Sequence, residues 1–569
     1  MLAACGPGPR TNGNSNSGGG DDMGGDDTNP PPVCPACTAD GTGVIDCQGG
    51  VTPCGSGMGC SNGVCENACQ AAEENHSSVG CDYWAIDMDA AEGPPMDACY
   101  TVFVANTSPD PVHINVTWHG NPVDMAQYAK LPQGEGTSLT YGAYDPVAGL
   151  ESGKVAIIFL AYALELGNVS CPVPAAVGTD AQINGTGTGY AFHVTTDSPV
   201  VAYQMLPYGG GAAAATGASL LVPASAWDTE YIAVSAWDDP APPIPIPMGP
   251  SHNVVASQDN TTVTITPIAD IAAGGGLPAG TAGQPWTTTL MAGQYLQITQ
   301  LEGISGSPIT ADKPVGVFGG HQIMSIDRCC GDHGEQMHTP VRALGNLYVA
   351  AAHGDRKPAG QSDPRIFHIY GAVDGTQLHY DPASIGGAAT VDAGGMVEIR
   401  TETPFTVQSQ DDTHPFAMYT YMSGAGDEGE GGWGDPDFVR LVPPAQYLSN
   451  YVFFTDVTYP FTVLTIVRQV QQDGTFADVD LDCLGSVPDW TPVGVNGEFQ
   501  ITHVKLVDHF NPVGNCNNGV HVMTSPGGFG VWVWGWGSED TNTGWVSYGY
   551  PAGEGVRPIN NVVIGRQAP

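Results

Sequence analysis

The chain has 569 residues, 41% of them hydrophobic, so it is long enough to hold several domains with buried cores. It contains 58 Asp and Glu against 15 Lys and Arg, a formal net charge of −43. A charge of this sign repels nucleic acid and anionic lipid surfaces at long range, so we expect neither as a partner. The charge does not exclude cationic partners or divalent metal ions.

The first residues carry a short motif that resembles the lipobox of bacterial lipoproteins. It reads Leu2-Ala3-Ala4-Cys5, and in a lipobox the cysteine receives a lipid after the signal peptide is removed. Only four residues precede Cys5, whereas a signal peptide needs a basic segment and an apolar segment of about 7–15 residues. We favour a shortened signal sequence over a chance match. Cys5 is then the lipid-attachment site, and we expect an outer-membrane lipoprotein on the extracellular face of the cell envelope.

Residues 1–33 are expected to hold this lipobox remnant and a disordered tether. From Gly6 onward the segment is rich in Gly, Asn, Ser, Asp and Pro, which bury too little apolar surface to offset the entropy of ordering. We expect no transmembrane helix, because the best apolar run, residues 155–164, has ten residues, well short of the roughly 20 that span a bilayer.

Fifteen cysteines indicate an oxidising compartment. Eight of them lie in residues 34–81 and predict a small disulfide-stapled module, whose pairing the sequence does not decide. These eight candidates are Cys34, Cys37, Cys47, Cys54, Cys60, Cys65, Cys69 and Cys81. Zinc at Cys34-Pro-Ala-Cys37 is the disfavoured alternative, because no second CxxC follows at zinc-ribbon spacing.

The other six disulfide candidates lie further along the chain. The natural pairs are Cys99 with Cys171 and Cys483 with Cys516. Cys329 and Cys330 are adjacent, and we expect each to join a distant cysteine rather than a metal ion.

A Tyr-led strand recurs four times after Cys81. The copies read YWAIDMD at Tyr83, YIAVSAW at Tyr231, YVAAAHG at Tyr348 and YVFFTDV at Tyr451. Each copy also holds a strand with Xaa-Pro near its start, and a shared link places a proline at positions 223, 340 and 443. Such a repeat indicates one supersecondary unit that is used several times, and arrays of this kind usually present surface for binding.

The repeats predict an all-β fold over residues 82–556, followed by a tail at 557–569. The copies are expected near 82–205, 220–322, 337–422 and 441–537. Gly and Pro make up 125 residues (78 plus 47), which disfavours long helices. We rank tandem sandwich-like modules first and a propeller-like arrangement as the alternative.

One tight hairpin is predicted within the second copy. The segments HNVVAS and TTVTITP flank Gln258-Asp259-Asn260, which contains a dipeptide typical of turns.

The stretch from His321 to His338 is the best enzyme candidate in the chain. It offers metal ligands and proton-transfer groups, namely His321, Asp327, Cys329, Cys330, Asp332, His333, Glu335 and His338. The spacing fits no zincin, because His333 and His338 are five residues apart and HExxH is missing. A structural loop is the favoured interpretation, with a metal site at His333 and His338 as the weaker one.

Two further patterns suggest binding. Asp478, Asp480 and Asp482 offer hard oxygen ligands for calcium, although alternation along a strand would also place all three on one solvated face. The alternating tryptophans Trp532, Trp534 and Trp536 point to the same side of a strand. A packed sheet interior is favoured for them over a sugar-stacking or partner-binding stripe.

Several segments together carry a family resemblance. They read VGCDYWAIDMD, SLLVPASAW, VVASQDNTTVTITP, ITADKPVGVFGGHQ, GEQMHTPVRALG, RLVPPAQYLSNYVF and VSYGYPAGE. They span residues 79 to about 553, and the chain resembles the IgGFc-binding protein N-terminal domain family in its bacterial surface lipoprotein form. Self-cleavage of the kind found in the animal member at Gly-Asp-Pro-His is not carried over, because Asp437 follows Gly434-Asp435-Pro436.

The resemblance implies a non-catalytic extracellular binding or adhesion protein, with an extracellular protein or a glycan as partner and no required cofactor. It does not imply antibody binding by this chain, and the sequence does not identify the ligand. The alternatives are a secreted metal-dependent hydrolase that uses the His321–His338 region, and a passive structural coat protein.

Overall fold

The computed structural model describes residues 35–38, 41–91, 99–162, 171–212, 215–238, 248–327, 330–357, 363, 365–426 and 431–565. The all-β prediction is confirmed, because strands dominate these residues and the α-helices found among them, α1 (Ala68–Asn75) and α2 (Met125–Tyr128), are short. In the part of the chain that the structure describes, no helix has the length and apolar character to span a membrane.

Four modules follow one another, each built around an antiparallel inner sheet. In the first module, this sheet runs in the order β15 (Gly217–Leu220), β14 (Phe192–Leu206), β7 (Tyr100–Asn106), β12 (Val155–Ala161), β10 (Ala129–Gln133) and β11 (Thr140–Ala143). The second runs β22 (Asp332–Met337), β21 (Pro308–Met324), β17 (Pro250–Ala256), β20 (Gln294–Thr299) and β13 (Gly187–Tyr190). The third runs β31 (Asp437–Arg440), β30 (Phe416–Met422), β24 (Arg365–Gly371) and β28 (Met396–Thr401). The fourth runs β40 (Ser547–Pro551), β39 (Val520–Trp536), β33 (Phe461–Gln469), β37 (Phe499–Asp508) and β36 (Thr491–Val493).

Each module also has outer strands that give it a sandwich-like second layer. These are β6 (Val79–Ala85), β8 (Ile114–Trp118) and β9 (Asn121–Pro122) in the first module, and β16 (Asp228–Ile232), β18 (Thr261–Ile265) and β19 (Trp286–Leu290) in the second. The third has β23 (Leu347–Val349), β25 (Thr376–Gln377), β26 (His379–Asp381), β27 (Thr390–Val391) and β29 (Thr406–Gln408). The fourth has β32 (Leu448–Phe454), β34 (Asp480–Leu481), β35 (Gly485–Ser486) and β38 (Asn511–Pro512).

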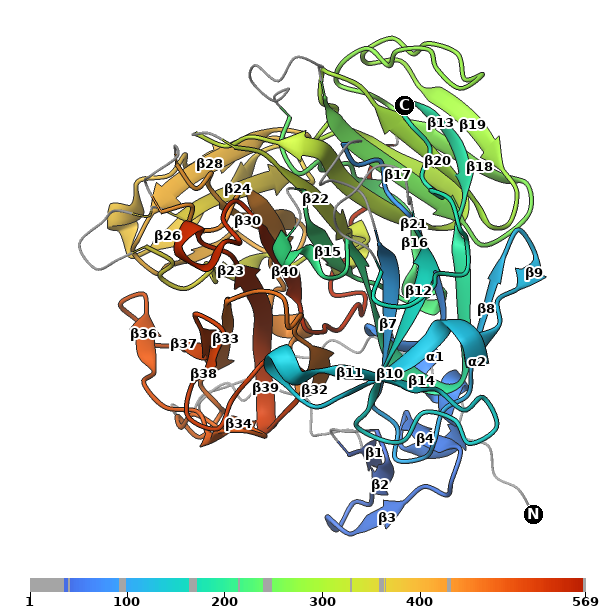
Figure 1. Ribbon diagram of the computed structural model, residues 1–569. Coiled ribbons are helices and arrows are strands. Elements are labelled where there is room, and N and C mark those ends of the chain that lie inside the picture. The colour runs from blue at the N-terminus through green and yellow to red at the C-terminus, as the bar shows by residue number, and fades with distance from the viewer. Residues whose placement is uncertain are drawn as a thin grey trace, which may run out of the picture.

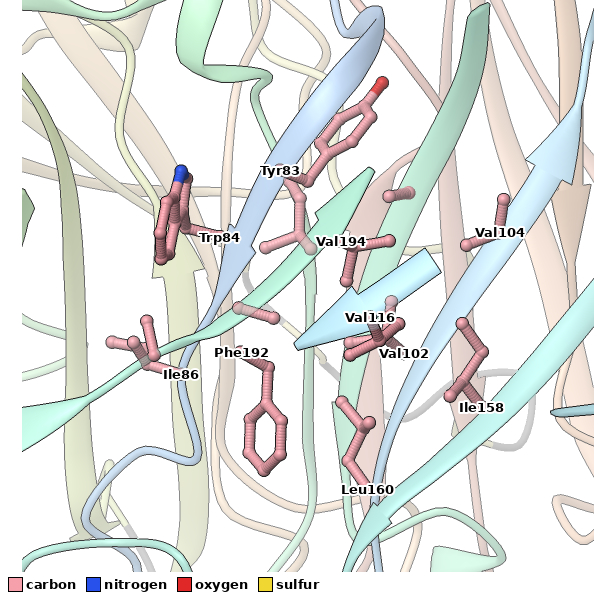
Figure 2. Packing of buried hydrophobic residues seen from close by; sticks show 14 of the residues in the cluster. Tyr83, Trp84, Ile86, Val102, Val104, Val116, Ile158, Leu160, Phe192 and Val194 are labelled. Carbon is pink, nitrogen blue, oxygen red and sulfur yellow. The ribbon is translucent and has the colours of Figure 1, made fainter. Parts of the chain in front are cut away.

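The four modules form a closed ring (Figure 1). The innermost strands β15, β22, β31 and β40 meet at the centre, where β15 and β31 each contact both β22 and β40. In the described residues, four hydrophobic cores contain residues of two neighbouring modules: first with second, second with third, third with fourth, and fourth with first. A further core lies within the second module. Figure 2 shows the first-module part of the first of these cores, where Tyr83, Val102, Ile158 and Phe192 pack together. This arrangement matches the propeller-like alternative, with sandwich-like layers within each module.

A proline marks the point where the long central strand of a module passes from the outer layer to the inner sheet. In β14, residues 192–196 pair with β8, whereas residues 200–206 pair with β7 and β15. Pro199 lies between the two parts, and Pro314 and Pro526 hold the corresponding places in β21 and β39. Because proline has no N–H to donate, it interrupts the ladder where the strand changes partners.

The predicted hairpin at Asp259-Asn260 is wrong. Strands β17 and β18 both pair with β21, on opposite halves of it, so the turn passes over β21 instead of joining two paired strands. Beneath this turn, the Nζ of Lys313 donates to the carbonyls of Asp259 and Asn260. The sequence around the turn resembles that of a hairpin, because it does not reveal that β21, about 50 residues later, pairs with both strands.

The four repeated tyrosines hold equivalent places in the ring. Tyr83, Tyr231, Tyr348 and Tyr451 are all fully or almost fully buried. In three modules the tyrosine hydroxyl accepts from the backbone amide three residues earlier, at 3.1 Å from Asp228, 3.2 Å from Gly345 and 3.1 Å from Leu448. A buried phenol needs such a partner, which explains why the motif recurs as a tyrosine and not as another apolar residue.

The C-terminal segment closes the ring. Ser78, just before β6, donates its amide to the carbonyl of Glu554 at 2.7 Å, and the Glu554 amide donates to the Ser78 hydroxyl at 2.9 Å. Beyond this point the Asn560 side chain donates to the carbonyls of Val341 and Leu344 at 2.8 and 2.9 Å. The tail predicted from residue 557 is therefore packed against the modules as far as residue 565 is described.

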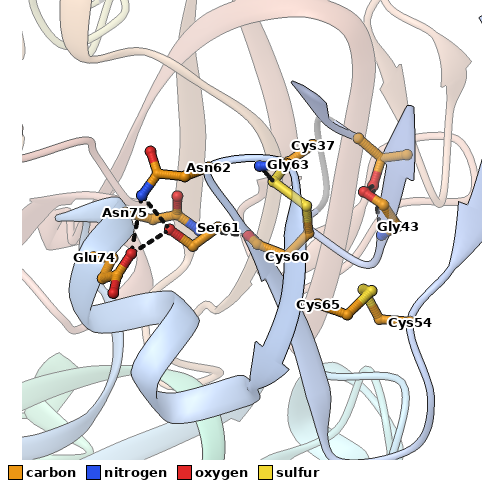
Figure 3. Close-up of a disulfide and its surroundings, with 11 residues drawn as sticks. Cys37, Gly43, Cys54, Cys60, Ser61, Asn62, Gly63, Cys65, Glu74 and Asn75 are labelled. Carbon is orange, nitrogen blue, oxygen red and sulfur yellow. Dashed lines mark hydrogen bonds between the residues drawn. A yellow bond between two sulfur atoms is a disulfide. The ribbon is translucent and has the colours of Figure 1, made fainter. Parts of the chain in front are cut away.

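The N-terminal module is held by disulfides, as expected of its composition. Within the described residues it contains β1 (Ala36–Cys37), β2 (Gly43–Ile45), β3 (Val51–Pro53), β4 (Met58–Ser61), β5 (Val64–Asn67) and helix α1. Three disulfides join Cys37 to Cys60, Cys54 to Cys65 and Cys69 to Cys81 among the described residues, and Cys47 is also disulfide-bonded. Figure 3 shows the first two pairs beside the bonds that Glu74 accepts from Ser61 and Asn62. Cys37 is thereby excluded as a zinc ligand, while Cys5 and Cys34 lie outside the described residues.

Candidate functional site

The residues of the enzyme candidate lie on buried strands at the centre of the ring. His321 is near the end of β21, and His333 and Glu335 belong to β22, with His338 directly after it. These four side chains are at most 2% exposed. The predicted loop is therefore a central strand of the second module. Cys329 lies outside the described residues, and Cys330 is disulfide-bonded.

Asp332 joins three of the four innermost strands. Its carboxylate accepts from the backbone amide of Thr216 just before β15, and from the amide of Ser547 in β40 at 3.0 Å. The Thr216 hydroxyl donates to the same carboxylate at 3.2 Å. Asp332 is fully buried, and burial raises its pKa well above the usual range. Its contacts identify it as a structural crosslink.

Other titratable groups at the centre are shifted toward their neutral forms. Burial raises the pKa of Glu335 to about 8, while its Oε2 accepts from Gln204 Nε2 at 2.7 Å. Burial lowers the pKa of His333 to about 4 and that of His338 to about 3. The His338 ring lies between the Val234 carbonyl and the Tyr419 hydroxyl, each at 2.8 Å. This ring cannot turn toward a substrate without breaking two contacts.

Two aspartates that sequence reasoning did not single out as a site lie close to Asp332. Asp435 and Asp437 are 0% and 1% exposed. Burial raises the pKa of both well above the usual range, and the charge of Asp332 raises it further. Nearby, Arg440 pairs with Glu554 in a buried ion pair. Buried acids without access to solvent fit a structural role better than turnover.

The predicted acidic run lies on a solvated face. Asp478, Asp480 and Asp482 are exposed, whereas Val479 and Leu481 between them are 1% exposed. The alternation is the one that the sequence suggested. Asp478 makes a distant ion pair, 4.0 Å from Arg468.

Asp482 lies in a group of three residues with metal-ligand chemistry. Asp482, Cys483 and His521 bring potential ligand atoms within 4.8 Å of one another. Cys483, however, is bonded to Cys516, so it has no thiolate to offer a metal. Cys483–Cys516 and Cys99–Cys171 are the two pairs expected from the sequence.

The alternating tryptophans belong to the core between the third and fourth modules. Trp532, Trp534 and Trp536 are at most 1% exposed. The packed interior that the sequence analysis favoured is therefore what the structure shows. These rings hold two modules together and are not available to a partner.

A pocket of about 250 Å³ lies between the third module, the fourth module and the C-terminal segment. Its lining includes Leu344, Leu347, Pro443, Pro444 and Ile559, with Asp412 as an acidic group. Its lining does not assemble a nucleophile, a base and an oxyanion donor, as an acyl-transfer site requires.

An exposed group of aromatic rings lies at the edge of the first module. Trp118 ends β8, His119 begins the turn to β9, and Tyr190 ends β13. The His119 ring is 3.9 Å from the Tyr190 ring and 4.3 Å from the Trp118 ring, between centroids. We call these three residues the aromatic platform. Sequence reasoning missed it, although Trp-His-Gly between two strands is a signal of aromatic groups at an exposed turn.

Comparison with known proteins decides the family. The model of the family described as IgGFc binding protein matches residues 217–535, more than half of the chain. The chain belongs to the IgGFc-binding protein family. The matched region runs from β15 through β39 and so covers three of the four innermost strands. No curated protein matches the chain.

The family is one of binding proteins, and the resemblance to it that was seen in the sequence is confirmed for the family as a whole. The disulfides and the all-β fold are those of an extracellular or secreted protein.

Proposed function

We propose that this chain is a non-catalytic binding or adhesion protein on the extracellular face of the cell envelope, with an extracellular protein or glycan as its partner. The observation that carries the proposal is the burial of the reactive side chains His321, His333, Glu335 and His338, on or beside β21 and β22, inside a ring that belongs to a binding family. Burial directs these groups to structural work and leaves the outer surface for recognition.

A lipid on Cys5 is the proposed anchor, and the segment 1–33 is its tether. The support is the lipobox-like sequence and the composition of the segment. Expression of the chain behind a complete bacterial signal sequence tests it: mass spectrometry should find a lipid on Cys5, and Cys5→Ser should release the protein into the medium. Release of both forms to the same extent would remove the anchor from the proposal.

Binding is tested by immobilising the full chain and passing over it a native envelope extract and, separately, mucin glycans. We expect one partner to be retained saturably and eluted by the soluble chain. A passive coat protein would retain none. As a matched arm, Glu335→Gln should retain the same partner, because Glu335 is buried. Turnover of a hydrolase substrate that is lost in Glu335→Gln and accompanied by stoichiometric zinc would favour the enzyme instead.

A further inference from the structure

The aromatic platform has the geometry of a sugar-stacking site. The Trp118 indole lies nearly parallel to the buried Phe192 ring, at 14° and 5.5 Å between centroids, and Trp118 as a whole is half-buried. The core therefore backs the indole on the Phe192 side, while part of Trp118 stays accessible to solvent. The plane of the His119 ring is at 88° to that of the indole, and the plane of the Tyr190 ring is at 34° to that of the His119 ring. Trp118 thus forms the base of the platform, and the rings of His119 and Tyr190 form one side of it.

His119 occupies a position that its own backbone does not favour. Its φ is +50°, and the φ of Gly120 after it is +72°, in the two-residue turn that connects the paired residues Trp118 and Asn121. Turns of this kind usually have Asn, Asp or Gly at the first central position. For a residue with a Cβ, the left-handed conformation costs about 1 kcal/mol.

Polar groups border the rings. The Trp118 indole N–H donates to the Tyr190 carbonyl at 3.4 Å, which fixes the indole relative to β13. The Gln294 side chain reaches the Tyr190 hydroxyl at 3.5 Å, and Asn121 is exposed at the start of β9. Rings that provide apolar faces beside a few amide and hydroxyl groups suit a pyranose, which has C–H faces and hydroxyl edges. Figure 1 places β8 and β9 at the outer edge of the ring of modules.

The charge of the chain selects among glycans. With a formal net charge of −43, the protein repels anionic ligands. The platform itself holds no Lys or Arg. We propose that the aromatic platform binds an uncharged hexose unit of a glycan, stacked on Trp118 and bordered by His119 and Tyr190. This inference rests on the proposed binding function and names one ligand class and one surface for it.

The test is calorimetric titration of the full chain with neutral hexose hexamers built of glucose, galactose or mannose, and with an acidic hexamer of galacturonate. We expect one neutral hexamer to bind with one site per chain and the acidic one not to bind. Trp118→Ala and Tyr190→Ala should each weaken binding about tenfold. His119→Asn keeps a residue that tolerates the left-handed turn, and it should also weaken binding.

Two controls match these variants. Trp490→Ala removes a half-buried tryptophan of the fourth module, and His509→Asn alters another histidine at positive φ in a turn. Both should bind like the wild type. Binding by no neutral hexamer, or equal binding by the platform variants, would overturn the inference. If the platform variants still retain the partner captured from envelope extract, the proposed binding function is kept and the platform is rejected as the binding site.

Should Trp118→Ala lower the thermal stability, His119→Asn and Tyr190→Ala decide the question, because both residues are exposed. Unchanged affinity in these two stable variants would contradict the proposal.

Discussion

Ser78 and Glu554 exchange two hydrogen bonds across a sequence separation of 476 residues. The bonds join the residue before β6 of the first module to the segment leaving the last, so the ring is closed by hydrogen bonds and not only by packing. The side chain of Glu554 extends inward, where it pairs with Arg440. Both side chains are at most 3% exposed. The segment that closes the ring therefore also carries a buried ion pair.

Removing one member of this pair should weaken the ring strongly. Glu554→Ala leaves the Arg440 guanidinium buried without its partner, and we expect a loss of about 3–5 kcal/mol in the free energy of unfolding. Chemical denaturation followed by tryptophan fluorescence measures it. The matched control is Glu151→Ala, at an exposed acid of the first module, with an expected change within about 0.5 kcal/mol. Equal effects of the two substitutions would show that the pair does not stabilise the closure.

The buried carboxyl of Glu335 predicts a pH-dependent stability. Its folded pKa, about 8, lies above the usual value near 4.3 for an unfolded chain. The protonated group therefore contributes fully below about pH 4, and its contribution is lost as the pH rises to about 8. Glu335→Gln cannot ionise. Within this window, the difference between its free energy of unfolding and that of the wild type should therefore increase by about 1.4 kcal/mol per pH unit.

Urea titrations of both proteins at several pH values measure this difference. Burial lowers the pKa of His333 and His338, so their contribution is lost in the opposite direction, as the pH falls. Because both proteins contain these histidines, their effect cancels in the difference. Glu498→Gln, at an exposed acid, serves as the control. A difference that stays constant from about pH 4 to 8 would mean that Glu335 is not held neutral.

The Cys483–Cys516 disulfide should stabilise the fourth module. It closes a loop with a sequence separation of 33 residues, for which the loss of unfolded-state entropy corresponds to about 3–4 kcal/mol. The double variant Cys483→Ala with Cys516→Ala should lose stability by this amount. Calorimetry of the oxidised proteins measures it. An unchanged midpoint would show that the bond contributes nothing to the fold.

Metal removal should have no effect on stability. Asp478 and Asp480 extend into solvent, and Asp482 already accepts from the amides of Cys483 and Val522 at 2.8 and 3.2 Å. We expect EDTA to shift the thermal midpoint by less than about 1 °C, because only a bound ion adds stability. A drop that calcium reverses, and that Asp480→Asn abolishes, would establish a calcium site at the acidic run.

Much of the fold follows from local sequence signals. The tyrosines mark equivalent strands because each buried hydroxyl needs a backbone partner nearby, as for Tyr231 with Asp228. The proline of each long strand marks its change of partners. The outward alternation of Asp478, Asp480 and Asp482 also follows from a period of two.

The centre of the ring could not be predicted in this way. Strand β22 reads DHGEQM, a polar sequence that suggests an exposed or catalytic segment. It is buried because partners arrive from other modules: Ser547 binds Asp332, and Gln204 binds Glu335. The aromatic platform was missed for a related reason, since β13 brings Tyr190 to Trp118 by pairing with a strand of the second module.

Hydrogen exchange at three backbone amides tests the closed ring most directly. The amides of Asp228, Gly345 and Leu448 each donate to the buried tyrosine hydroxyl of a different module. If the modules form one ring, these amides should exchange with the same free energy of opening, and Glu554→Ala should lower all three values equally. Three distinct values, with only the Leu448 amide responding to Glu554→Ala, would contradict the account and describe four independent modules.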